Sequence, residues 1–283
     1  MKNKKIVYGI LISLFVLTLI LAGIIFYSKN QELKVIFLDV GQGDAILIEQ
    51  GSRQIWIDGG SSGQILLNKL GKYIPFWDRE IEMIIATHPD QDHIAGLVDA
   101  MKNYKVDLIM DTSAQSDSQI FKKYQEIIQT KNIESLKAEA GIKIKLADNQ
   151  EMEILHPKSS GLWDKSDTNA GSIVARLSSG KTSFLLTGDL PSEQEINIKV
   201  EKTDVLKVAH HGSKYSTSQE FLDKIAPMEA IISAGKNNRY GHPASEVLER
   251  LQNKNIKIWR TDEVGDIEYR CASKDMQCAM VAN

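Results

Sequence analysis

The feature that most limits what this chain can fold into is a set of four potential metal ligands within six residues. These ligands are His88, Asp90, Asp92 and His93. They follow the apolar run Ile81–Thr87, which indicates a buried strand, and a segment with helical periodicity comes next. Pro89 stiffens the loop that presents them. Imidazole and carboxylate groups bind divalent metals, and four ligands so spaced cannot all reach one ion. The motif therefore favours two metals side by side.

Other Asp and His side chains lie in a similar context. They are Asp189, His210, His211 and His242. Asp189 follows the expected strand Ser183–Thr187, and the two adjacent histidines follow Val205–Ala209. In layered α/β folds the ends of strands gather at one rim of the molecule, where sites form. Four segments therefore bring ligands to one rim. His156 also follows a strand, but it stands alone, so we interpret it as structural.

The order of expected elements indicates an α/β fold. The expected strands are Leu33–Asp39, Asp44–Glu49, Gln54–Asp58, Ile81–Thr87, Val106–Met110, Lys143–Leu146, Met152–Leu155, Ser172–Leu177, Ser183–Thr187, Val205–Ala209, Glu229–Ser233, Ile256–Trp259 and Asp266–Tyr269. The expected helices are Ile65–Tyr73, Ile94–Met101, Gln119–Gln129, Ser192–Ile198, Ser218–Ile225 and Ala244–Leu251. In each half a run of strands is followed by strands alternating with helices. This order predicts two packed sheets with helices outside, in one domain over residues 33–283.

The N-terminal segment determines the expected compartment. Residues 6–27 carry no charge and extend about 33 Å as a helix, enough to cross a bilayer. Lysines within residues 1–5 predict a cytoplasmic tip, a signal-anchor helix over 6–27, a joint over 28–32 and an extracytoplasmic body. A cleaved signal peptide, which would give a secreted protein, is the rival interpretation.

Charge and cysteine content narrow the function further. With the four lysines of residues 1–30 set aside, 30 basic residues face 37 acidic ones, a net charge of −7. Such a body does not attract a polyanion by its overall field, so local cations must hold one. Cys271 and Cys278 form a disulfide outside the cytoplasm or remain two free thiols, and the sequence leaves both open.

Together these motifs resemble a known family. The segment from His88 to His93 resembles the metal motif of the metallo-β-lactamase fold, with Asp90 in place of its second His. Three further segments, Phe37–Asp44, Leu186–Asp189 and His210–Ser213, are similar to the C-terminal hydrolase domain of the ComEC family of DNA-uptake channels. The resemblance runs from about Leu33 to Asp266. It implies a four-layer αβ/βα sandwich, here preceded by one transmembrane helix, in a stand-alone form.

The resemblance also implies a site with two divalent ions, either zinc or manganese. One ion takes His88, Asp90 and His210, and the other takes Asp92, His93 and His242. Asp189 bridges the two ions, and Asp92 and Asp189 are the catalytic carboxylates, with a hydroxide held between the ions as nucleophile. Asp39, Asp58 and His211 support the ligands from behind.

The expected activity is hydrolysis of a phosphodiester by a membrane-anchored, extracytoplasmic enzyme. Lys214, Asn238 and Arg239 lie near the last ligands in the sequence and are candidates for holding a phosphate. The substrate is then DNA or another phosphodiester, which makes the protein a phosphodiesterase or nuclease. Two alternatives remain: hydrolysis of a wall polymer or its choline-phosphate esters by the same site, and a non-enzymatic tethered protein with a structural metal.

Overall fold

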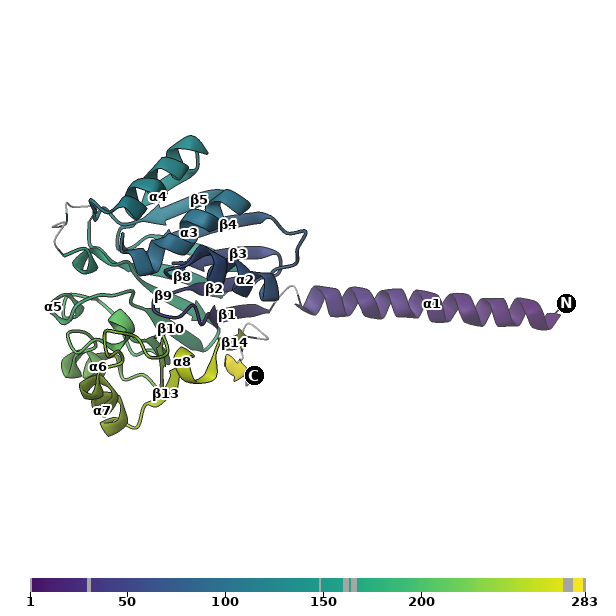
Figure 1. The fold of residues 1–283 in the computed structure, drawn as a ribbon. Coiled ribbons are helices and arrows are strands. Elements are labelled where there is room, and N and C mark those ends of the chain that lie inside the picture. Colours follow the sequence, from purple (N-terminus) through teal and green to yellow (C-terminus); the bar gives the residue numbers. More distant parts are fainter. Residues whose placement is uncertain are drawn as a thin grey trace.

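A computed structural model describes residues 2–29, 32–147, 149–159, 163, 167–271 and 277–281. Met1 of the expected cytoplasmic tip, residues 30 and 31 of the expected joint, and residues 282 and 283 of the expected domain lie outside these ranges. The described body consists of two sheets and the helices that cover them (Figure 1).

The first sheet has eight strands. They are β1 (Leu33–Phe37), β2 (Ile46–Gln50), β3 (Arg53–Ile57), β4 (Glu80–Ala86), β5 (Lys105–Asp111), β6 (Glu134–Lys137), β14 (Ile267–Cys271) and β15 (Ala279–Val281). Their order is β15-β14-β1-β2-β3-β4-β5-β6. Helices α2 (Gly63–Tyr73), α3 (Gln91–Asn103) and α4 (Gln119–Thr130) cover the outer face of this sheet, where Trp56, Leu66 and Leu97 share an apolar cluster.

The second sheet has seven strands. They are β7 (Lys143–Ala147), β8 (Gln150–His156), β9 (Val174–Ser179), β10 (Thr182–Leu186), β11 (Val205–Lys207), β12 (Glu229–Ile232) and β13 (Lys257–Arg260), in the order β13-β12-β11-β10-β9-β8-β7. Four short helices accompany them: α5 (Ser192–Glu195), α6 (Gln219–Ile225), α7 (Ser245–Asn253) and α8 (Thr261–Val264). The apolar faces of α6 and α7 pack through Phe221 and Val247 into the outer cluster of this sheet.

The main core lies between the two sheets. Val35 and Phe37 of β1 face this core, whereas Ile36, between them, faces the helices. Successive side chains of a strand point to opposite faces, so the apolar run Val35–Phe37 of β1 serves two clusters at once. The four-layer sandwich expected from the sequence is confirmed.

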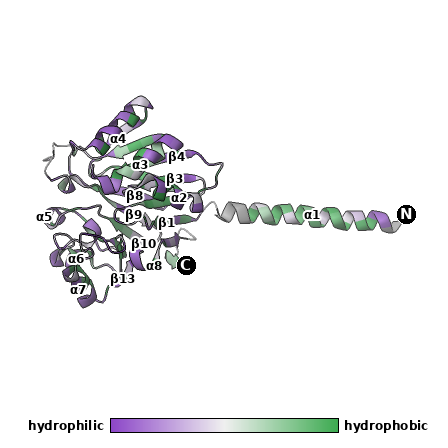
Figure 2. Cartoon of the chain, in the orientation of Figure 1, coloured by the Kyte–Doolittle hydropathy of each residue, from purple (hydrophilic) through white to green (hydrophobic). Residues whose placement is uncertain are grey.

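Helix α1 (Lys2–Lys29) projects away from this body (Figure 1). Its segment Lys4–Ile24 is long and apolar enough to cross a membrane and is not buried by the rest of the protein. Figure 2 shows the hydrophobic colouring along most of α1, in contrast to the mixed colouring of the body. Cys271 and Cys278 form a disulfide. Both features are consistent with an extracytoplasmic body.

Several elements differ from the sequence expectation. Helix α3 begins at Gln91, so it includes two of the ligands that were expected in a loop. Helix α5 is a single turn that ends at Glu195 rather than at Ile198. Strands β6 and β15 were not expected. Strand β6 is exposed throughout and lacks apolar alternation, so only its pairing with β5 defines it.

Candidate metal centre

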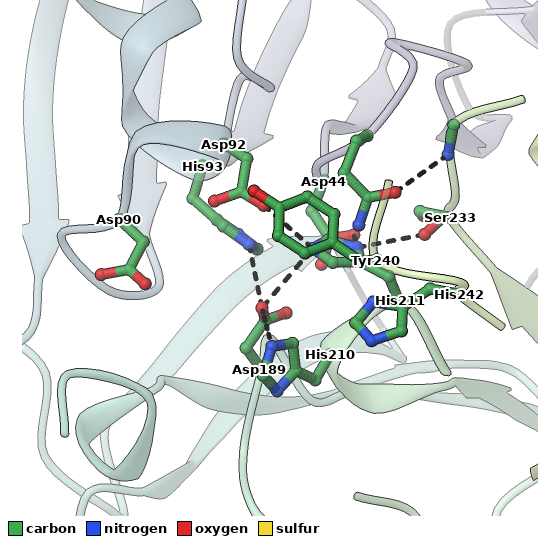
Figure 3. A network of polar contacts seen from close by, with 12 residues as sticks. Asp44, Asp90, Asp92, His93, Asp189, His210, His211, Ser233, Tyr240 and His242 are labelled. Atoms are coloured by element: carbon green, nitrogen blue, oxygen red, sulfur yellow. Dashed lines mark hydrogen bonds and ion pairs between the residues drawn. The ribbon is translucent and has the colours of Figure 1, made fainter. Parts of the chain in front are cut away.

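The Asp and His side chains singled out in the sequence come together where the two sheets meet at one rim. Strands β3 and β4 run parallel and end directly before Asp58 and Thr87. Strands β10 and β11 of the other sheet also run parallel and end shortly before Asp189 and His210. Figure 3 shows Asp92, His93, Asp189 and His211 pointing toward one another. Parallel strands deliver their carboxyl ends to one edge, which is why segments distant in sequence meet here.

Asp58 orients the ligands of the first sheet. One oxygen of its carboxylate accepts the backbone N–H of Thr87 at 2.8 Å, and the other accepts the Thr87 hydroxyl at 2.7 Å. That second oxygen also lies 2.8 Å from Nδ1 of His93. A carboxylate behind Nδ1 leaves Nε2 as the free, basic nitrogen, the arrangement that metal-binding histidines use. His93 is buried, and its Nε2 faces the centre of the cluster.

Asp189 occupies the centre of the cluster. Its Oδ2 lies 3.3 Å from Nε2 of His93, 3.5 Å from that of His211, 3.8 Å from that of His210 and 3.9 Å from that of His88. The other carboxylate oxygen makes no hydrogen bond within the described part of the chain. One buried carboxylate surrounded by four imidazoles can bridge two cations.

The two adjacent histidines differ in their surroundings. Both have left-handed backbone angles, with φ of 51° for His210 and 54° for His211. The ring of His211 is buried: its Nδ1 faces the Ser233 carbonyl at 3.0 Å and its Nε2 lies 3.4 Å from Oδ2 of Asp92. The side chain of His210 remains 31% exposed. The structure therefore places His211, which the sequence analysis assigned a supporting role, among the inward-facing nitrogens.

Two expected ligands lie at the margin. Asp90 is 40% exposed, with Oδ2 at 3.9 Å from Nε2 of His88, and its Oδ1 accepts the Thr168 hydroxyl at 2.6 Å. Figure 3 shows Asp90 apart from the other carboxylates. The ring of His242 lies 5.6 Å from that of His210 and 6.4 Å from that of His211, measured between centroids.

A buried ion pair lies next to His211. Lys207, near the end of β11, pairs with Asp44, and both side chains are almost fully buried. The other oxygen of Asp44 lies 3.3 Å from Nδ1 of His211. Burial raises the pKa of Asp44, but Lys207 and His211 outweigh this effect and lower the pKa to about 2. The Asp44 carboxylate is thus held ionised behind His211.

The charges of the cluster shift the pKa values of its members in different directions, and those of His88 and His242 are lowered, chiefly by burial. Burial raises the pKa of Asp189, yet His211 and His93 hold it well below its usual range. Burial lowers the pKa of His93, but Asp189 and Asp58 raise it well above its usual value. The pKa of His211 rises to about 9, because Asp189 and Asp44 outweigh burial. The ring nitrogens of His93 and His211, which bind protons strongly in this environment, can bind a metal cation instead.

The donor atoms fit metal ions. The buried atoms that make no hydrogen bond within the described residues include Nε2 of His88, His93 and His211, Nδ1 of His242 and Oδ1 of Asp189. Buried polar atoms are normally paired, so unpaired nitrogens that converge need an explanation. Ligand atoms of His88, His93 and Asp189 lie within 4.8 Å of one another, as do those of Asp92, His93 and His211. Mixed imidazole and carboxylate donors suit zinc or manganese.

The expected phosphate-holding residues lie in different places. The Asn238 amide donates to the carbonyls of Gly235 and His242 and accepts two backbone N–H groups, so it holds its own loop together. Arg239 lies over the ring of Tyr240, 5.0 Å from its centroid. Lys214 lines a separate surface depression.

Two other residues lie apart from the cluster. Asp39 accepts a hydrogen bond from the Gly41 N–H and lies 3.8 Å from Lys69. Its backbone N–H donates to Asp266. His156 has Nδ1 at 2.9 Å from the Ser172 carbonyl. Neither belongs to the groups of converging ligand atoms among the described residues.

A cleft of about 410 Å³ opens beside the centre. It is lined by Gln42, Ser61, Gln91, Asp92, Asn238, Arg239 and Tyr240. Figure 3 shows the Tyr240 ring in front of the cluster.

The sequence analysis did not identify Tyr240 or Lys207. A lone Lys within an apolar strand was the available signal for Lys207, since a buried charge needs a partner. Tyr240 gave no comparable signal.

Comparisons with known proteins agree with this architecture. The family model of the metallo-beta-lactamase superfamily matches residues 38–236. The chain is 35% identical to ComE operon protein 3 of Bacillus subtilis over 87% of this chain and 34% of that protein. It is 31% identical to Recombination protein 2 of Haemophilus influenzae over 81% of this chain and 28% of that protein. The chain therefore spans about a third of the length of these curated relatives.

A solved structure shares the fold. The metallo-beta-lactamase fold protein YhfI from Bacillus subtilis superposes with a TM-score of 0.57 at 12% identity, covering 85% of this chain and all of YhfI. At that identity the likeness concerns the fold alone.

Proposed function

This chain belongs to the metallo-β-lactamase superfamily and is related to the ComEC family, and from that membership we propose that it is a membrane-anchored phosphodiesterase that acts on nucleic acid outside the cytoplasm. One observation carries the proposal: buried ligand atoms that make no hydrogen bond converge from two sheets next to an open cleft lined by Arg239 and Tyr240. A structural metal site is normally closed, whereas this centre borders a space that a substrate can enter.

We assign the ligands to two ions within this proposal. Asp92, His93 and His211, whose ligand atoms lie within 4.8 Å of one another, would hold one ion. His88, Asp90 and His210 would hold the other, and Asp189 would be shared between the two. This division puts His211 where the sequence analysis put His242. Bound there, two cations supply Lewis-acid stabilisation and lower the pKa of water.

The chain itself holds these groups in place. Asp58 fixes the orientation of His93, and Asp44 supports His211 from behind. Asp189 would provide the negative charge that offsets the repulsion between two such cations. In this proposal Asp92 and Asp189 remain the carboxylates nearest the reaction.

The cleft supports a nucleic acid as substrate. An aromatic ring such as that of Tyr240 can stack on a base, and the adjacent Arg239 guanidinium can pair with a phosphate. A local cation of this kind is needed because the body carries a net charge of −7, with 30 basic residues against 37 acidic ones beyond residue 30. The name of the Haemophilus influenzae relative refers to recombination, a process on DNA.

Turnover of defined substrates tests this proposal. Full-length protein with added manganese or zinc is assayed on single-stranded DNA, double-stranded DNA, RNA, a choline-phosphate ester and a generic phosphodiester. We expect nucleic-acid cleavage that chelation abolishes, and loss of nearly all activity in Asp189→Asn, because an amide is a poor bridge between cations. Asp39→Asn, at a carboxylate away from the cluster, is the matched control and keeps its activity. Cleavage of the choline-phosphate ester alone would assign the site to wall-polymer chemistry instead.

A further inference from the structure

An exposed aromatic pair lies in the loop between α2 and β4. Phe76 is 78% exposed and Trp77 is 72% exposed, the highest values among the large apolar side chains of the described body. Their ring centroids are 4.9 Å apart in an edge-to-face arrangement. Burying either side chain in an apolar environment is worth about 1.5–3 kcal/mol, so two adjacent exposed rings indicate a binding surface.

Strand register places this pair at the end of the sheet where the chain enters from α1. Leu33, the first residue of β1, pairs with Gln50, the last of β2. Gln50 in turn pairs with Arg53, the first residue of β3. Strand β4 runs parallel to β3, so the loop that precedes Glu80 lies at this same end. Figure 1 shows α1 leaving the body beside the start of β1.

Chain length keeps this end close to any membrane that α1 spans. Lys29 ends α1 and Leu33 begins β1, and four residue steps extend at most about 14 Å. The apolar span ends at Ile24, about 7.5 Å of helix before Lys29. This distance is similar to the thickness of the headgroup layer, about 5–8 Å on each side. In a membrane that α1 spans, the start of the first sheet therefore lies within about 14 Å of the outer edge of the headgroup layer.

We propose that Phe76 and Trp77 insert into the outer interface of the bilayer that α1 spans, so that the body is held at two points. Trp is enriched at membrane interfaces because its ring is apolar and its N–H is polar. Lys72 and Arg79, both exposed, flank the pair; Lys72 pairs with Asp266 at 3.3 Å, and Arg79 lies over the Tyr104 ring. The inference rests on the membrane anchoring proposed above and is independent of the hydrolytic activity.

Insertion would fix the direction in which the metal centre faces. Strand β4 runs from Glu80, beside the aromatic loop, to Ala86, directly before the ligand loop. Its seven residues extend about 23 Å. The metal centre thus lies at the opposite end of the first sheet, turned toward the extracytoplasmic space, where a polymeric substrate has access.

Tryptophan fluorescence tests the proposal directly. Of the four tryptophans, Trp56 is buried, Trp163 packs near the His156 ring and Trp259 donates a hydrogen bond to Glu229 in the second sheet. Full-length protein is reconstituted into phosphatidylcholine vesicles whose acyl chains carry bromine near the headgroups. We expect lipid-dependent quenching in the unchanged protein and its complete loss in Trp77→Ser. Trp259→Phe, the matched control, retains the quenching.

Flotation of the same vesicles distinguishes a failure of membrane anchoring from a failure of Trp77 insertion. Protein that floats with vesicles but shows no loss of quenching in Trp77→Ser keeps its anchor and overturns the insertion. Protein that does not float overturns both the anchor and the insertion. A third outcome is cross-linking between two copies of the Trp77→Cys variant, with no lipid-dependent quenching in the unchanged protein. That outcome would mean that Phe76 and Trp77 contact another protein chain, and it would also overturn the proposal. A cleavage assay on each variant shows whether hydrolysis is affected independently.

Discussion

His210 and His211 are neighbours in the sequence but have different roles in the geometry. Only His211 is buried with both ring nitrogens facing acceptors of the site: Nδ1 toward Ser233 and Asp44, and Nε2 toward Asp92 and Asp189. Two nitrogens that are constrained in this way fix the ring, and a fixed ring binds a metal more tightly than a mobile one.

This difference predicts how two His variants behave. His211→Ala should lose about one metal equivalent, with binding at that site at least about 100-fold weaker, because a ligand and its supporting contacts are both removed. His242→Ala should keep both metals, since its ring lies 6.4 Å from that of His211 and outside the converging group. Elemental analysis of the purified variants, after removal of excess metal, measures the number of metal ions bound per chain.

The reverse result would restore the ligand set implied by the family resemblance. If His242→Ala loses a metal and His211→Ala keeps two, then His242 is the ligand and His211 supports it from behind. Circular dichroism of both variants confirms that each comparison concerns folded protein.

The sequence predicted which residue types reach the rim but not which way they point. Asp and His after parallel strands had to arrive at one edge, and they do. The choice between two adjacent histidines depends on two successive left-handed residues, and no pattern in the sequence indicates these angles. The pairing of Asp44 with Lys207 joins residues 163 positions apart, so it follows from the packing of two sheets rather than from spacing.

At the scale of elements, Asp266 connects α2 to the start of β14. Its carboxylate accepts hydrogen bonds from Lys69 at 2.8 Å and from the Tyr73 hydroxyl at 2.9 Å. It also accepts the backbone N–H of Asp39 at 2.9 Å. Burial raises the pKa of Asp266, but Lys69 and the Asp39 N–H outweigh this effect and lower the pKa.

This lowered pKa predicts a pH-dependent contribution to stability. A carboxyl group with a lower pKa in the folded state stabilises the fold above its unfolded pKa, about 3.9, and this contribution is lost as the pH falls through the folded value. Asp266→Asn should therefore lower the free energy of unfolding by about 1.5–3 kcal/mol near neutral pH. The difference from the unchanged protein should shrink below about pH 4. Urea denaturation at a series of pH values measures both; a difference that grows toward acid would contradict this account.

Element boundaries were predictable where burial imposes a pattern. The strands that serve two apolar clusters, such as β1 and β4, were recognised because each contains a run of consecutive apolar residues. Strand β6 was missed because its residues are all exposed, and β15 because it has only three residues beyond the disulfide-linked segment. Helix α3 begins earlier than its apolar periodicity because the ligand loop itself forms the first turn.

At the scale of the whole molecule, the chain has two distinct ends. Helix α1 and the aromatic loop lie at the end of the first sheet where β1 and β4 begin, and the ligands lie at the other. If α1 spans a membrane, as proposed, the ligands face away from that membrane. The metal centre is the part of the protein on which the proposed function depends.

The number of metal equivalents per chain that full turnover requires tests the metal centre most directly. Full-length protein stripped of metal is titrated with manganese or zinc while cleavage of single-stranded DNA is followed. Two ion sites that share Asp189 predict that turnover stays low through the first equivalent and reaches its plateau at two equivalents per chain. Two bound equivalents without cleavage of any phosphodiester, or full turnover at one equivalent, would contradict the account of a dinuclear hydrolase.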